Sequence, residues 1–236
     1  MNKPTTARSG GRQWRVRFRC RLLRRSTSQR WLGVRTTLRN LKQAEEVRSA
    51  IGKTAANADT IEFVPADLNS YAGWARAVTG ADYVLHVASP VPTVDPKSDE
   101  ELVRPVCDGT LRVIRAARDA GVKRSISAII YGRGVREKPF TEEDWTDETN
   151  RDDSSPYDRS KTIADRAAWA WVAAEGPQLE LVTVNPSLVL GPVLGSDFSA
   201  SVEAVRKLLD GSIPALPRLG FSVADDVTSM RCNYWR

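Results

Sequence analysis

The chain has 236 residues and a net charge of +6, from 35 basic and 29 acidic side chains, and its 41% hydrophobic content is ordinary for a globular protein. No apolar run approaches the roughly 18 residues of a membrane span, and the chain does not start with the apolar segment of a secretory signal. The scattered cysteines, Cys20, Cys107 and Cys232, fit neither a disulfide framework nor a zinc site. We therefore expect a cytoplasmic protein without membrane contact or a metal site.

The positive charge is concentrated at one end of the chain. The first 44 residues contain no acidic side chain and carry a net charge of +13, so the remaining residues carry −7. We interpret residues 1–33 as a basic, irregular N-terminal segment and the sequence after it as an acidic globular body.

From residue 34 onward, apolar patterns predict strands that alternate with helices. The predicted strands cover 34–38, 60–64, 83–87 and 179–184, and the predicted helices cover 41–51, 71–78, 106–120, 156–174 and 199–210. Because the run at 83–87 is almost wholly apolar, it is typical of a strand buried on both faces. The alternation predicts an α/β fold with a doubly wound parallel sheet, in which functional residues lie beyond the carboxyl ends of the strands.

Tyr157 and Lys161 form the most informative pair in the sequence. Their spacing of four residues places both side chains on one face of the predicted helix 156–174. A phenol ionises near pH ~10, and a neighbouring ammonium favours the phenolate. Such a pair can move a proton to or from a substrate hydroxyl or carbonyl, while a serine hydroxyl holds the same oxygen. The same spacing also arises by chance on many helices, so the pair needs support from its surroundings.

Other motifs accompany this pair in a set order. Asp67-Leu68 follows the second predicted strand, residues 84–90 end the third, and residues 182–187 and 191–192 follow the helix. In this order the motifs resemble the extended short-chain dehydrogenase/reductase superfamily, also described as NAD-dependent epimerase/dehydratase. The dihydroflavonol-reductase-like branch, which includes aldehyde reductases, is the most similar. The resemblance covers about residues 34–222 and implies a Rossmann-like domain there.

The resemblance also implies a role for each matching residue. Tyr157 is expected to donate a proton to a substrate carbonyl, and Lys161 to favour tyrosine ionisation and hold the nicotinamide ribose. Arg39 stands where NADP-preferring members place an arginine that can bind a 2′-phosphate, with a solvated surface charge as the alternative. NADP is thus the expected cofactor and NAD the alternative. The other implied cofactor contacts are Asp67 and Leu68 at the adenine, Val87, Ala88 and Ser89 beside the phosphates and ribose, and Pro186 and Ser187 beside the nicotinamide.

The sequence departs from the family pattern in three places. Only Gly10-Gly11 stands where a glycine-rich turn should approach the cofactor pyrophosphate. The apolar strand expected after residue 124 is missing, which leaves Ser125 as the candidate catalytic serine and Ser127 as the second choice. The match stops near residue 222, so we expect an irregular tail at 223–236 and a largely missing substrate lobe. We hypothesise that both ends are encoded in a shifted reading frame or come from a misassigned gene model.

His86 and two tryptophans are expected to serve packing. His86 lies inside the apolar run 84–87, so we favour a packing role over catalysis. Trp169 and Trp171 lie on the predicted helix 156–174, and at least one should pack in the core.

The sequence therefore predicts an NADP(H)-dependent oxidoreductase that interconverts a small-molecule carbonyl and its alcohol. Because three family features are compromised, we expect weak activity or none. An epimerase- or dehydratase-like protein and an inactive nucleotide-binding protein are alternatives of the same fold. Nucleic-acid binding by residues 1–44, with Trp14 and Trp31 for stacking, is a less favoured alternative, since no nucleic-acid-binding motif is present. Aldehydes, ketones, flavonoids and sterols all fit as substrates.

Overall fold

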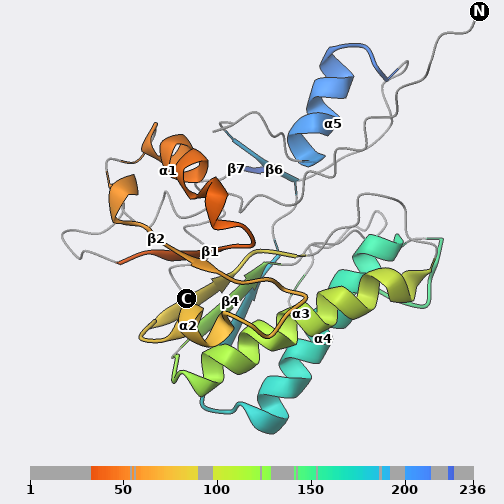
Figure 1. Ribbon diagram of the computed structural model, residues 1–236. Coiled ribbons are helices and arrows are strands. Elements are labelled where there is room, and N and C mark those ends of the chain that lie inside the picture. Colours follow the sequence, from red (N-terminus) through yellow and green to blue (C-terminus); the bar gives the residue numbers. More distant parts are fainter. Residues whose placement is uncertain are drawn as a thin grey trace, which may run out of the picture.

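The computed structural model describes residues 33–53, 55, 57–89, 98–122, 124–128, 141, 143–152, 154–185, 188–191, 200–213 and 223–225. Figure 1 shows these residues as strands and helices that alternate along most of the chain. Within these ranges, no helix has the length and apolar character needed to cross a bilayer.

The strands form three parallel groups. β1 (Arg35–Leu38) pairs with β2 (Glu62–Pro65), while β4 (Arg124–Ala128) lies between β3 (Tyr83–His86) and β5 (Glu180–Val184). β6 (Leu188–Leu190) pairs with β7 (Val223–Asp225). Parallel pairing brings the carboxyl ends of neighbouring strands to one edge, and the predicted parallel α/β architecture is confirmed.

The helices connect these strands in chain order. A short 3-10 turn, η2 (Leu41–Gln43), leads into α1 (Ala44–Gly52), and a second, η3 (Ala58–Thr60), precedes β2. The others are α2 (Trp74–Val78), α3 (Asp99–Asp119), α4 (Pro156–Glu175) and α5 (Ala200–Leu209). Each predicted helix is present, although α3 begins seven residues earlier than its predicted start at 106 and contains Pro105.

The main core lies between the two long helices and the three-stranded sheet. Figure 1 shows α3 and α4 side by side against β3, β4 and β5. Ile114 of α3, Ala168 and Trp171 of α4, and Leu181 of β5 belong to one buried cluster. Trp171 is buried while Trp169 is 41% exposed, so the expectation that at least one tryptophan packs in the core is confirmed. The core therefore fixes α4, which carries Tyr157 and Lys161, against the sheet.

A second core lies between α1 and the first two strands. Leu38 of β1, Val47 and Ile51 of α1, and Ile61 before β2 form a separate buried cluster. Arg48 of α1 stands over the ring of Phe63, 5.0 Å from its centroid, and thereby joins the helix to β2. This cluster fixes where the carboxyl ends of β1 and β2 lie.

A single glycine sets the sharp turn into α2. Gly73 has a φ of +88°, and a Cβ atom there would lie 2.0 Å from the carbonyl oxygen of Pro65. Since only glycine tolerates both the left-handed backbone and that contact, Gly73 positions the segment between β2 and α2.

Three local predictions need correction. The strand expected to be missing after residue 124 is present as β4, which is held by backbone pairing to strands on both sides. β3 is not buried on both faces, because Tyr83 is 55% and Leu85 39% exposed. The segment 223–236, predicted to be irregular, begins with the strand β7, and β6 supplies its pairing partner.

Candidate active site

The first turn of α4 is defined by its own sequence. Ser155 caps the helix by accepting a hydrogen bond from the backbone N–H of Asp158 at 3.2 Å, and the Asp158 carboxylate accepts one from the backbone N–H of Ser155 at 3.0 Å. This reciprocal capping box, with Pro156 in the first helical position, starts the helix at a single residue. The start of the helix thereby fixes the positions of Tyr157 and Lys161.

Tyr157 and Lys161 lie together as predicted. The Nζ atom of Lys161 is 5.2 Å from the centroid of the Tyr157 ring. Lys161 is only 5% exposed, whereas Tyr157 is half-buried and packs beside the α3–α4 contact formed by Leu102, Val106 and Ala164. A buried ammonium beside a partly accessible phenol is suited to proton transfer with a bound molecule.

His86, the last residue of β3, is buried against α3. The imidazole is buried and lies 3.4 Å (Nε2 to Oγ1) from Thr110 of α3, which is also buried. Burial, together with the positive charge of Lys161, lowers the pKa of His86 to about 4. His86 is therefore neutral at neutral pH.

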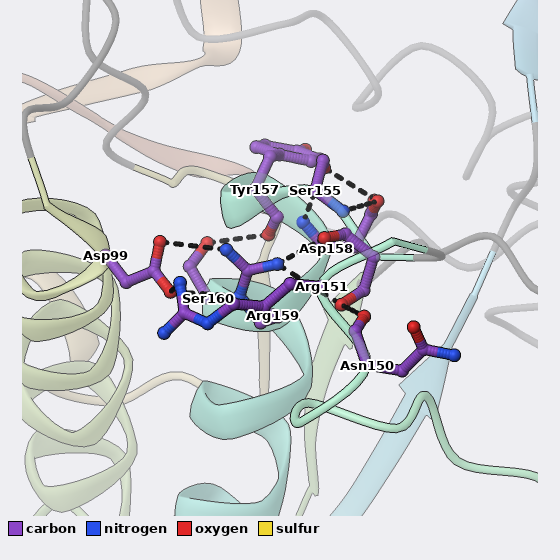
Figure 2. A network of polar contacts seen from close by, with 9 residues as sticks. Asp99, Asn150, Arg151, Ser155, Tyr157, Asp158, Arg159 and Ser160 are labelled. Atoms are coloured by element: carbon purple, nitrogen blue, oxygen red, sulfur yellow. Dashed lines mark hydrogen bonds and ion pairs between the residues drawn. The ribbon is translucent and has the colours of Figure 1, made fainter.

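Figure 2 shows a polar network around the first turn of α4. Arg159 binds Asp99, the first residue of α3, through two contacts: Nε to Oδ2 at 3.0 Å and Nη2 to Oδ1 at 2.9 Å. Its Nη1 atom donates to the carbonyl oxygen of Ser154, and Arg151 adds a 3.2 Å ion pair to Asp99. The Arg159 guanidinium holds the pKa of the Asp99 carboxyl below its ordinary value. The network joins three segments: the loop before α4, α4 itself and the start of α3.

The loop after β2 is held by three backbone contacts. The Asp67 carboxylate accepts a hydrogen bond from Asn69 N–H at 2.9 Å, and its carbonyl accepts one from the Trp74 indole at 2.9 Å. Arg112 of α3 donates to the carbonyl of Leu68. A Cβ at Gly109 would lie 3.2 Å from that of Leu68, so the absence of a side chain there lets α3 approach the loop closely. These contacts fix Asp67 and Leu68, the expected adenine contacts.

Arg39 follows β1 at the same edge of the sheet. Leu38, the last residue of β1, pairs with Pro65, the last of β2, so Arg39 and Asp67 extend from adjacent strand ends. The Arg39 side chain is exposed, and within the described part of the chain its guanidinium makes no ion pair or hydrogen bond. Such a guanidinium is available to a phosphate.

The remaining predicted site residues are less completely described. Val87, Ala88 and Ser89 follow β3 directly, in the position expected for a cofactor wall. Ser125 occupies the second position of β4 opposite Val84, whereas Ser127 lies opposite His86, nearer the carboxyl end. Pro186 and Ser187 lie outside the described residues.

Sequence reasoning missed two buried ionisable side chains on α4, Arg159 and Asp165. Asp165 is 4% exposed, its Oδ1 atom has no hydrogen-bond partner among the described residues, and burial raises its pKa to about 7. The helical repeat contained a signal for it, since Asp165 is four residues after Lys161 on the same face. For Arg159 no comparable signal exists, because its partner is 60 residues away.

The sequence matches a known family and several known proteins. Residues 20–227 match the NAD dependent epimerase/dehydratase family, a range slightly wider than the predicted 34–222. The chain is similar to tetraketide alpha-pyrone reductase 2 of Arabidopsis thaliana, with 35% identity over 209 residues that cover 83% of this chain and 64% of the relative. It is also similar to dihydroflavonol 4-reductase of Zea mays, with 30% identity over 190 residues that cover 77% of this chain and 52% of the relative. These relatives confirm the predicted resemblance to the dihydroflavonol-reductase-like branch.

A solved structure shows the same fold. The yeast methylglyoxal/isovaleraldehyde reductase complexed with NADPH superimposes with a TM-score of 0.70 at 23% identity, covering 84% of this chain and 65% of that one. The chain thus spans less than two thirds of the length of each of these three proteins.

Proposed function

Because the chain belongs to the NAD dependent epimerase/dehydratase family, we propose that it is an NADP(H)-dependent oxidoreductase that interconverts a carbonyl and an alcohol. The observation that carries this proposal is the Tyr157–Lys161 pair on α4, in which Nζ of Lys161 lies 5.2 Å from the centroid of the Tyr157 ring. Two further observations support the proposal: the relatives are named as reductases, and the yeast structure contains NADPH.

The described residues fit both ends of a dinucleotide. At one end, Arg39 offers an exposed guanidinium for a 2′-phosphate, and Asp67 and Leu68 form a fixed loop for the adenine. At the other end, Tyr157 and Lys161 offer a phenol and an ammonium to the nicotinamide ribose and the substrate. Among the described residues no glycine-rich turn joins a strand to a helix.

The chemistry of this site follows from its protons and charges. The nicotinamide, when bound, supplies or accepts the hydride. The Tyr157 phenol donates its proton to the carbonyl oxygen in the reducing direction and takes it back in the other. Lys161 stabilises the phenolate that this transfer leaves, and its burial strengthens that attraction. Because His86 is neutral, it does not add a second charge beside the ammonium.

We assign the hydroxyl that holds the substrate oxygen to Ser127, in place of the predicted Ser125. The strand register supports this choice, since Ser127 pairs with His86 near the carboxyl end of β4. If the assignment is right, Ser127→Ala lowers kcat at least tenfold and Ser125→Ala leaves it unchanged. The reverse result would restore Ser125.

Titration of the 236-residue chain with NADPH and NADH tests the proposal. We expect saturable binding of NADPH, and Arg39→Ala should weaken it about tenfold without affecting NADH, since only NADPH carries the 2′-phosphate. Arg104→Ala is the matched control, because the Arg104 side chain is 86% exposed and its ion pair, at 3.9 Å, is to Asp108 of the same helix, α3. If the wild-type chain binds neither dinucleotide, the proposed function is wrong.

Several accompanying proposals can be tested with the same protein. We propose weak turnover, a small carbonyl substrate and a cytoplasmic location, the last supported by the scattered cysteines. Robust NADPH turnover would refute the proposal of weak turnover.

Nucleic-acid binding through the basic N-terminus stays a prediction. Its test is a deletion of residues 1–32, since β1 begins at Arg35 and a deletion to residue 44 would remove it.

A further inference from the structure

We propose that the Arg159–Asp99 pair is a positioning device that sets the first turn of α4, and with it the distance between the Tyr157 phenol and the Lys161 ammonium. Neither residue is among those assigned to the proposed reaction, so both would act through the helix. The inference deepens the proposed function, on which its catalytic consequence rests, by naming residues that control the proton donor.

The contact is built for orientation. Arg159 uses two nitrogens on two oxygens of Asp99, an arrangement that fixes the plane of the guanidinium as well as its distance. The third nitrogen, Nη1, binds the carbonyl and hydroxyl oxygens of Ser154, the residue before the helix cap. Arg159 is 5% exposed, so water competes weakly for these bonds. A buried, forked contact of this kind can resist rotation of the first turn.

The position of Arg159 on the helix explains how this restraint reaches the site. Residue 159 is two positions after Tyr157 and two before Lys161. At about 100° per residue, each lies some 200° around the helix from Arg159. Tyr157 packs beside Leu102 and Val106 of α3, the same helix to which Arg159 is bound through Asp99. Rotation or displacement at the anchor would therefore be transmitted directly to both site residues.

A second ion pair on α4 provides an internal comparison. Arg166 binds Glu148 at 2.8 Å and stacks on the Trp145 ring, 4.8 Å from its centroid. The Arg166 side chain is 53% exposed, against 5% for Arg159, and it lies beyond Lys161 on the helix. Both pairs tie α4 to another segment, but only the Arg159 pair adjoins the turn that carries Tyr157.

The test measures the pH midpoint at which Tyr157 ionises, by NMR of chains labelled at the tyrosine Cζ carbon. The chain has five tyrosines, and Tyr157→Phe identifies the signal. Asp99→Asn and Arg159→Met are compared with wild type. If the pair acts by position, both variants raise the midpoint by about one pH unit, because Lys161 moves away from the phenol. If it acts only by its charges, Asp99→Asn lowers the midpoint and Arg159→Met raises it. That opposite response would overturn the proposal.

Arg159→Lys keeps the proposal testable if Arg159→Met fails to fold. It retains the charge and loses the fork, so positioning predicts a smaller upward shift and an electrostatic role predicts none. The control Arg166→Lys should leave the midpoint unchanged, and an equal shift there would also overturn the proposal.

The ionisation experiment needs no cofactor, so it separates this inference from the proposed function. If the wild-type chain binds no NADPH but both variants raise the pH midpoint of Tyr157, the proposed function is wrong and the Arg159–Asp99 pair still positions the helix. Where turnover is measurable, Asp99→Asn should lower kcat tenfold or more with little change in KM for NADPH, in keeping with a small displacement of a reacting group. An unchanged kcat, or an unchanged pH midpoint of Tyr157, would count against a positioning role for the Arg159–Asp99 pair.

Discussion

The two ends of the proposed dinucleotide site are held in different ways. At the nicotinamide end, Lys161 and His86 are buried within the packing of α3, α4 and the three-stranded sheet. At the adenine end, Arg39 is exposed and Asp67 sits on a loop fixed by a few hydrogen bonds. Proton transfer requires reacting atoms within hydrogen-bond reach, whereas recognition of a phosphate tolerates a mobile, forked side chain. The two ends should therefore respond differently to substitution.

Tyr157→Phe should give the largest effect. Loss of the phenol removes the proton donor, and we expect kcat to fall about a thousandfold, while NADPH still binds. Arg39→Ala should do the opposite, with a higher KM for NADPH and little change in kcat. Steady-state kinetics with varied NADPH separates the two. A Tyr157→Phe chain that keeps its kcat would remove the basis of the proposed chemistry.

Core substitutions extend the comparison to folding. Ile114 of α3 is 1% exposed in the main core, and Ile114→Ala should lower the free energy of unfolding by about 3 kcal/mol. Ile51 is 4% exposed and belongs to the smaller cluster of α1, β1 and β2, so Ile51→Ala should cost nearer ~2 kcal/mol. Urea denaturation measures both. Equal losses would indicate that the two halves pack with the same rigidity.

The pH dependence of stability should reveal the raised pKa of Asp165. Its pKa is raised by burial from 3.8 to about 7, so between these values the folded chain holds a proton that the unfolded chain has released. Stability therefore falls as pH rises through this window and is flat above it. Asp165→Asn removes that slope and should gain roughly 2 kcal/mol over wild type between pH 5 and 7. Denaturation midpoints at several pH values test this.

His86 should make stability change with pH in the opposite direction to Asp165, so it provides a control. Its pKa is lowered from 6.5 to about 4, so the unfolded chain binds the extra proton and stability rises with pH in that window. In wild type the two groups partly cancel below pH 6.5. We expect Asp165→Asn to show a clear rise from pH 4 to 6.5 and His86→Gln to show a steeper fall than wild type. A wild-type profile that neither variant changes would refute both assignments.

The features predicted correctly from the sequence are those that depend on residues close together in the chain. The four-residue spacing of Tyr157 and Lys161 places them together whatever the rest of the chain does. β4 was missed because Arg-Ser-Ile-Ser-Ala has one large apolar residue, and its pairing with β3 and β5 comes from distant parts of the chain. The Asp99–Arg159 contact joins residues 60 apart, so local patterns in one sequence cannot indicate it.

Arg112 should give the smallest effect, confined to the adenine end. It donates to the Leu68 carbonyl and stands 4.4 Å from the centroid of the Tyr71 ring, which is 69% exposed. Arg112→Met keeps much of the apolar stem and loses these contacts, at a cost of about 1 kcal/mol. Amide hydrogen exchange should quicken in residues 66–70 and not in α4, with NADPH binding weakened about threefold and kcat unchanged. Quicker exchange in α4 as well would mean that the two ends are mechanically joined through α3, which contacts both.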